Sequence, residues 1–229
     1  MKKVAILQSN YIPWKGYFDI INAVDTFILY DQVQYTKNDW RNRNQINSKQ
    51  GLQWLTIPVR VESMDQKICE TKTSFSKWNK KHWNSIVANY GKSVGFKNHK
   101  DLFESLYLDC KTDYLSEINI LFIEAINKLL GINTEIVDSK DLNLEGDKNQ
   151  RLIEAIKKVG GNTYLSGPAA KSYLDESLFK KEGIQVEWKS YSNYPEYSII
   201  HPEFYHGISI LDVIFNNENV SKNLITARL

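Results

Sequence analysis

Cysteine is nearly absent from this 229-residue sequence, which holds only Cys69 and Cys110. Two cysteines cannot build a disulfide framework, and their scarcity favours a reducing compartment. No group of cysteines and histidines has zinc-site spacing, so the sequence predicts no metal centre. Long apolar runs are also missing, both at the start of the chain, where a signal peptide would need one, and elsewhere. These absences predict a cytoplasmic protein without a membrane span.

A strong excess of either charge is lacking as well. The chain has 29 Lys and Arg residues against 27 Asp and Glu residues, a net charge of +2. This balance gives no strong signal for nucleic acid or a membrane surface, but it is compatible with a modest anion such as a nucleotide sugar. Aromatic residues are plentiful, with 13 Tyr, 6 Trp and 9 Phe. Tyr and Trp offer flat faces with a polar tip, which suit sugars and bases, although most are expected to fill the core.

The order of apolar patterns predicts an α/β layered fold with a mainly parallel sheet. Residues 4–7, 17–23 and 26–30 read as strand, helix and strand, a Rossmann-like βαβ unit at the N-terminus. Further strands are expected at 54–59, 134–137, 162–165 and 184–188, and helices at 78–90, 100–108, 114–130, 149–159 and 208–216. We expect residues 1–229 to form a single domain with a possible helical subregion at 78–131.

Polar residues follow the predicted strands, and they mark the candidate site. Gln8 and Asp31 come directly after the first two strands, and Ser166 follows a later one. Ligands of such folds bind beyond the carboxyl ends of the strands, so these residues are expected to share one pocket. Ser166 and Gly167 also form a small-residue turn before a predicted helix, a natural but common anion cradle.

Two arginines alternate with asparagines at residues 41–44. Arg41 and Arg43 share a face if this segment is extended, and paired guanidinium groups fit a phosphate or carboxylate. The competing interpretation is a solvated charged turn. His82 lies inside the predicted helix 78–90, where a lone histidine is more often structural than catalytic.

Residues 8–18, QSNYIPWKGYF, resemble the opening motif of the WbqC-like proteins. The resemblance continues in order through 31–35 (DQVQY), 41–44 (RNRN), 54–59 (WLTIPV), 164–167 (YLSG), 173–174 (YL) and 209–216 (SILDVIFN). It covers nearly the whole chain, and the order is more specific than any single motif. Leu7 and Ser9 depart from the pattern, because the family typically has histidine and proline at these positions.

The resemblance implies a bacterial protein of O-antigen or surface-polysaccharide gene clusters. The leading hypothesis is a transferase that acylates the amine of a nucleotide-linked amino sugar, with glycine as a suggested acyl group. The acyl donor is left open between a thioester, an adenylate and an aminoacyl-tRNA, and no cofactor is assigned. The alternatives are a nucleotidyl- or phosphoryl-group transferase and a non-catalytic module that binds nucleotide sugars.

Roles are assigned to fifteen residues under this hypothesis. Asp31 is the expected general base, because only the neutral form of an amine attacks an acyl carbon; its neighbours Tyr30 and Tyr35 are expected to raise its pKa. The expected catalytic residues are Asp31, Gln8, Asn10 and His82, and the expected substrate-binding residues are Tyr11, Trp14, Tyr17, Gln34, Tyr35, Arg41, Arg43, Asn44, Ser166, Gly167 and Lys171.

Overall fold

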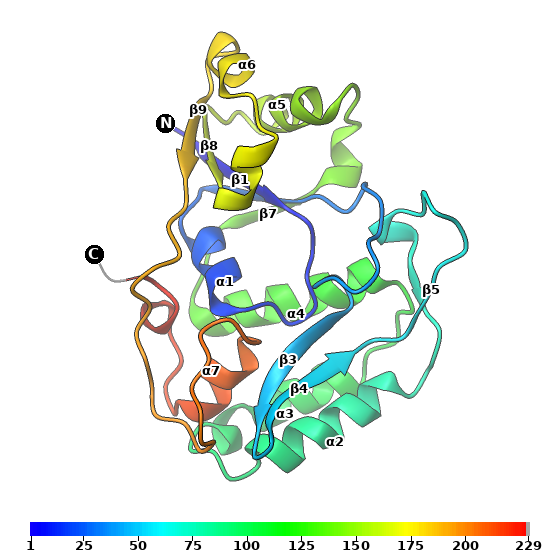
Figure 1. The fold of residues 1–229 in the computed structure, drawn as a ribbon, viewed down its shortest axis with the longest axis vertical. Coiled ribbons are helices and arrows are strands. Elements are labelled where there is room, and N and C mark those ends of the chain that lie inside the picture. The colour runs from blue at the N-terminus through cyan, green and yellow to red at the C-terminus, as the bar shows by residue number, and fades with distance from the viewer. Residues whose placement is uncertain (228–229) are drawn as a thin grey trace.

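The computed structural model describes residues 1–227 and is built on one parallel sheet (Figure 1). Its five strands are β1 (Lys3–Leu7), β2 (Thr26–Leu29), β7 (Glu135–Asp138), β8 (Thr163–Ser166) and β9 (Gln185–Trp188). They lie in the order β7-β2-β1-β8-β9, and every neighbouring pair is parallel. The predicted α/β layered fold with a parallel sheet is confirmed.

Helices cover both faces of the sheet. The helices α1 (Lys15–Asn22) and α4 (Leu115–Leu130) lie on one face, and α5 (Lys148–Lys158) and α6 (Glu176–Lys181) lie on the other (Figure 1). Alternate strand residues supply the two cores, since successive side chains of a strand point to opposite faces. Ala5 and Phe27 pack in the cluster that includes α1 and α4. Val4 and Ile28 pack in the cluster that includes α5.

A long insertion separates β2 from its crossover helix α4. It contains the hairpin β3 (Arg43–Ser48) and β4 (Gly51–Thr56), the short pair β5 (Val59–Arg60) and β6 (Lys72–Thr73), a 3-10 turn (Ile68–Glu70), and the helices α2 (Trp78–Tyr90) and α3 (Phe96–Leu108). The final helix α7 (Leu211–Asn216) packs beside the hairpin (Figure 1). One hydrophobic cluster runs from the sheet through the insertion to α7. The predicted helical subregion therefore shares the core of the sheet.

Most expected elements are present, and the differences have local causes. The predicted strand 54–59 is divided between β4, which ends at Thr56, and β5, which begins at Val59, because Pro58 between them has no N–H to donate to a strand ladder. The closing helix begins at Leu211 because Ser209 bonds to Gln45 and bridges to Trp14. The helix expected after Ser166 is a 3-10 turn, Pro168–Ser172; further 3-10 turns span Ser139–Leu142 and Lys222–Leu224.

The strand order creates a switch point between β1 and β8. From β1 the chain moves outward to β2 and β7, then crosses back to β8 on the other side of β1. The pairing of β1 with β8 stops at Val4 and Tyr164, whereas its pairing with β2 continues to Leu7 and Leu29. In open α/β sheets, ligands bind in the crevice at such a point, outside the carboxyl ends of the strands. Within residues 1–227 no helix combines the length and apolarity that a bilayer crossing requires.

Candidate functional site

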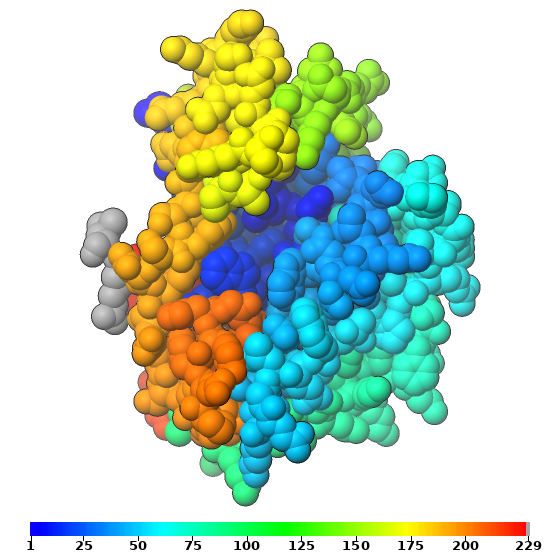
Figure 2. Space-filling view, in the orientation of Figure 1, coloured from blue at the N-terminus to red at the C-terminus, as the bar shows by residue number. Residues whose placement is uncertain are grey.

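A hollow opens on the face of the molecule shown in Figure 2. Blue N-terminal residues form its floor, and its rim consists of yellow and orange residues from beyond β8 and β9 on one side and lighter blue residues near 40 on the other. A cavity of about 260 Å³ lies here, lined by Asn10, Pro13, Trp14, Trp40, Asn44 and Gly207. Amide and indole groups dominate this lining, and none of these six residues is ionisable.

The loop between β1 and α1 is held in a strained conformation. Ile12 has a φ of 37°, a value that a β-branched residue rarely adopts and that costs about 1–3 kcal/mol. Asn44 on β3 stabilises this conformation, because its Nδ2 donates to Tyr11 O at 3.2 Å and to Ile12 O at 2.9 Å. Such strain concentrates at functional sites, where it fixes the positions of side chains before a ligand binds.

Trp14 forms an aromatic wall of the cavity. Its indole ring lies over Gly16, where a Cβ atom would come within 2.3 Å of the ring. On its other side the indole meets Tyr191 at a centroid distance of 5.2 Å and Tyr194 at 5.9 Å. Only glycine at position 16 leaves room for this arrangement.

The turn after β8 reaches the same region through Tyr191. A Cβ atom on Gly167 would lie 3.4 Å from the Tyr191 hydroxyl, and the Tyr191 ring contacts Trp14. Because β1, β2 and β8 are parallel, Gln8, Asp31 and Ser166 stand at one edge of the sheet, as expected. Ser166 is nevertheless buried, and neither it nor Asp31 lines the 260 Å³ cavity.

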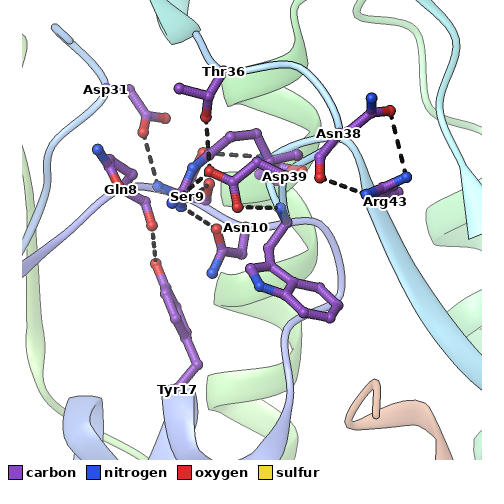
Figure 3. A network of polar contacts seen from close by, with 12 residues as sticks. Gln8, Ser9, Asn10, Tyr17, Asp31, Thr36, Asn38, Asp39 and Arg43 are labelled. Carbon is purple, nitrogen blue, oxygen red and sulfur yellow. Dashed lines mark hydrogen bonds and ion pairs between the residues drawn. The ribbon is translucent and has the colours of Figure 1, made fainter. Parts of the chain in front are cut away.

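Asp31 is buried, with 2% of its surface exposed, and both carboxylate oxygens are engaged. One accepts from the Ser9 amide at 2.8 Å (Figure 3), and the other accepts from the hydroxyl of Ser116 on α4. Burial raises the pKa of Asp31, while the hydrogen bonds from Ser116 and Ser9 and the nearby Arg41 act against the rise. These contacts favour a role for Asp31 in positioning the opening loop.

The two arginines diverge, because residues 40–42 form a turn and not the extended segment that a shared face requires. Arg41 donates to Ser9 O at 3.4 Å and to the side-chain oxygen of Asn10. Arg43 donates to Asn38 (Figure 3). Its guanidinium also lies 4.4 Å from the centre of the Trp54 ring. Anion binding by this pair stays a prediction, and any such role requires the two side chains to act from different places.

His82 lies in the core, beside a separate cavity of about 190 Å³. Its Nε2 contacts Thr56 O at 3.1 Å, and since a carbonyl only accepts, this nitrogen carries the proton. Its Nδ1 therefore accepts from the Tyr11 hydroxyl at 2.9 Å, and that hydroxyl accepts from Tyr107 at 2.8 Å. Burial lowers the pKa of His82 to about 4, so the ring is neutral at pH 7. Tyr11, in the middle of this chain of hydrogen bonds, is fully buried.

The remaining predicted residues occupy different surroundings. Tyr17 is buried, and its hydroxyl donates to Gln8 O at 3.0 Å (Figure 3). Tyr35 is buried beside the insertion, and exposed Gln34 donates to Met64 O. Lys171 is exposed, with its ammonium group 5.3 Å from the centre of the Trp188 ring. Thus Asn10, Trp14 and Asn44 line the cavity, while Gln34, Lys171 and His82 lie away from its lining.

Two buried charged residues of α1, Lys15 and Asp19, were not among the residues predicted from the sequence. Lys15 is 1% exposed, and its ammonium group lies 5.3–5.4 Å from the ring centres of Tyr194, Tyr197 and Phe204. Burial lowers the pKa of Lys15 to about 8. Asp19 is paired with Lys189 at 2.8 Å and accepts from Tyr194 at 2.8 Å. Both residues fix the segment after β9 against α1. The sequence feature that could have revealed them is their position within an otherwise apolar helix.

A metal site is not evident in the part of the chain that the structure describes: no group of three or more His, Cys, Asp or Glu side chains there is arranged to hold an ion. The chemistry available at the cavity is that of amides, indoles and the buried polar groups behind them.

The sheet order defines a Rossmann-like α/β protein, a class of fold in which ligands commonly bind at the switch point. Residues 8–223 match the model of the WbqC-like protein family, and the chain belongs to this family. It is 45% identical over 217 residues to the uncharacterized protein Rv1507c of Mycobacterium tuberculosis, a match that covers 94% of each chain. No solved structure matches the chain.

Proposed function

We propose that the protein is a transferase that binds a nucleotide-linked amino sugar in the switch-point cleft and acylates its amine. Glycine is the leading candidate for the acyl group, and surface-polysaccharide synthesis, including O-antigen synthesis, is the setting that the family resemblance suggests. The observation that carries the proposal is the cavity lined by Asn10, Trp14, Trp40 and Asn44 at the carboxyl end of β1. Indole faces stack on sugar rings, and amides bond to hydroxyl groups, so this lining suits a neutral sugar.

The surrounding residues provide the other parts of the proposed site. Arg41 uses the side-chain oxygen of Asn10, which leaves the Asn10 NH2 group for the substrate. Gln8 directly follows β1, and we assign it the role of orienting the acyl group. Arg41, Arg43 and the Ser166–Gly167 turn are the proposed contacts for the nucleotide phosphates, with Lys171 at the outer rim.

Acyl transfer requires the amine to be neutral when it attacks and to lose a proton afterwards. The amine nitrogen forms a bond to the acyl carbon, and the bond from that carbon to the donor's leaving group breaks. His206 precedes the cavity residue Gly207, and its pKa is lowered by partial burial and by the nearby Lys15. A lowered pKa favours the neutral imidazole that can accept a proton, and we assign His206 as a candidate proton acceptor in addition to Asp31.

A nucleotidyl- or phosphoryl-group transferase is the second candidate. The sheet order favours it, because the loop after the first strand at a switch point is a common place for nucleotide phosphates. Lys15, which starts α1 in this loop, is buried among aromatic rings. The loop therefore presents less positive charge than such chemistry uses, and acyl transfer remains the leading proposal. A module that binds nucleotide sugars without turnover is the third reading.

The first prediction concerns Trp14. Trp14→Ala removes the aromatic wall and is expected to weaken binding of a nucleotide-linked amino sugar at least about tenfold, as truncation of a buried aromatic anchor does. Isothermal titration calorimetry measures this loss. Gly16→Ala should produce a similar loss, because its Cβ atom displaces the same indole ring.

Phe75→Ala serves as the control, since Phe75 is 46% exposed and lies beside the separate cavity of His82. Its affinity should match that of the unchanged protein. Equal affinity in Trp14→Ala and the unchanged protein would mean that the sugar does not bind against this wall.

A further inference from the structure

A second polar cavity lies at the same edge of the sheet, next to the carboxyl ends of β2 and β7. Its volume is about 370 Å³, and the residues that line it include Tyr30, Gln32, Lys67, Ser139, Lys140 and Arg151. Tyr30 and Gln32 follow β2, and Ser139 and Lys140 follow β7. The proposed sugar cavity, by contrast, adjoins the β1 loop.

Positive charge predominates in this second cavity. Lys67, Lys140 and Arg151 line it together with one carboxylate, Glu145. Lys140 is paired with Asp138 at 3.2 Å. For Lys67 and Arg151, residues 1–227 provide no carboxylate within ion-pair distance. Lys67 and Arg151, which come from separate elements, thus line one cavity without an ion-pair partner, and Glu145 is the one carboxylate among its lining residues.

Two polar atoms of the cavity residues are also unsatisfied. Ser139 is 2% exposed, and its hydroxyl has no hydrogen-bond partner within the described chain. The same is true of the Nε atom of Arg151, which is shielded from solvent. Native proteins leave few buried polar groups without partners, and such groups often mark the place of an absent ligand or water. A partly buried guanidinium without a partner is a good receptor for a phosphate, which it binds with forked hydrogen bonds.

We propose that this cavity binds a phosphate group of the acyl donor. The inference rests on the proposed function, and it narrows the donor to a small phosphoester such as an acyl adenylate or a phosphopantetheine thioester. The cavity falls within the volume range of small-molecule sites. The two cavities share no lining residue, so the donor's anchor and the sugar would occupy separate places beside loops that follow strands of one sheet.

The test uses AMP and coenzyme A as probes of the two donor types, with the full chain and isothermal titration calorimetry. At least one probe should bind the unchanged protein, and Arg151→Gln and Lys67→Gln should each weaken it about tenfold or more. Arg60→Gln is the matched control, because Arg60 is an exposed cation on β5 outside the cavity lining, and its variant should bind as the unchanged protein does.

Binding of AMP alone supports an adenylate donor, and binding of coenzyme A alone supports a thioester. The proposal is overturned if neither probe binds at millimolar concentration, or if both cavity variants bind as tightly as Arg60→Gln. Lys67 is exposed, so its variant remains informative if Arg151→Gln fails to fold. If a probe binds in a way that depends on Arg151 but the protein catalyses no acyl transfer, the anion site stands and the proposed function is rejected.

Discussion

Asp31→Ala should destabilise the protein by about 2–5 kcal/mol. The substitution leaves the Ser9 amide and the Ser116 hydroxyl without acceptors in a buried site, and each unsatisfied group costs about 1–3 kcal/mol. Asp31→Asn is the matched variant, since its oxygen can accept from Ser9 while its NH2 group donates to Ser116. We expect Asp31→Asn to unfold within about 1 kcal/mol of the unchanged protein, as measured by urea denaturation.

The same pair of variants separates the two roles considered for Asp31. If it positions the opening loop, Asp31→Asn should keep kcat within about tenfold, and His206→Gln should lose more. If it is the general base, Asp31→Asn should lower kcat by about 10²–10⁴ while remaining folded. The latter outcome would contradict the positioning role that its contacts favour.

Acid should destabilise the protein through His82. The folded state holds the pKa of His82 at about 4, against about 6.5 in an unfolded chain. As the pH falls below 6.5, His82 binds a proton in the unfolded state but stays unprotonated in the folded state. The contribution of His82 to the free energy of unfolding is therefore fully present above pH 6.5 and is lost progressively toward pH 4. This difference in pKa corresponds to about 3 kcal/mol.

Urea denaturation of the unchanged protein and of His82→Gln at pH 7 and pH 4.5 measures this contribution. The variant should lose less stability on acidification, by about 2–3 kcal/mol, because it has no imidazole at position 82 that binds a proton on unfolding. Other titrating groups, including Asp31, are common to both proteins and cancel in the comparison. His206→Gln is the histidine comparison, and it should remove a smaller part of the acid sensitivity, because burial lowers the pKa of His206 less than that of His82. An identical pH dependence in all three proteins would show that His82 does not titrate in this way.

The fold was largely predictable because its helices and strands carry strong local patterns. The helix 78–90 was predicted with the bounds that α2 has, and all five strands of the sheet were predicted within about two residues. The exceptions depend on distant contacts. β3 reads as a polar segment, yet Asn44 and Asn47 are buried there because their side chains bond to backbone groups far away in the sequence.

The candidate site was predictable in its location but not in its contacts. The opening motif indicated the loop after β1, and Asn10, Trp14 and Asn44 do line the cavity there. Helix α4, in which the sequence predicted no site residue, supplies Ser116 and Asn119, which hold Asp31 and Ser9. Tyr191 lies in an irregular segment without periodicity, so nothing local in the sequence places it against Trp14.

Mass spectrometry of reaction mixtures tests the central proposal most directly. The protein is incubated with a panel of nucleotide-linked amino sugars, each combined with a glycyl or other acyl thioester, an acyl adenylate or an aminoacyl-tRNA. The account predicts that one pair yields a nucleotide sugar heavier by a single acyl group on its amine, and that Trp14→Ala loses this product while Phe75→Ala retains it. Release of pyrophosphate or transfer of a nucleotidyl group, with the amine left unmodified, would contradict it.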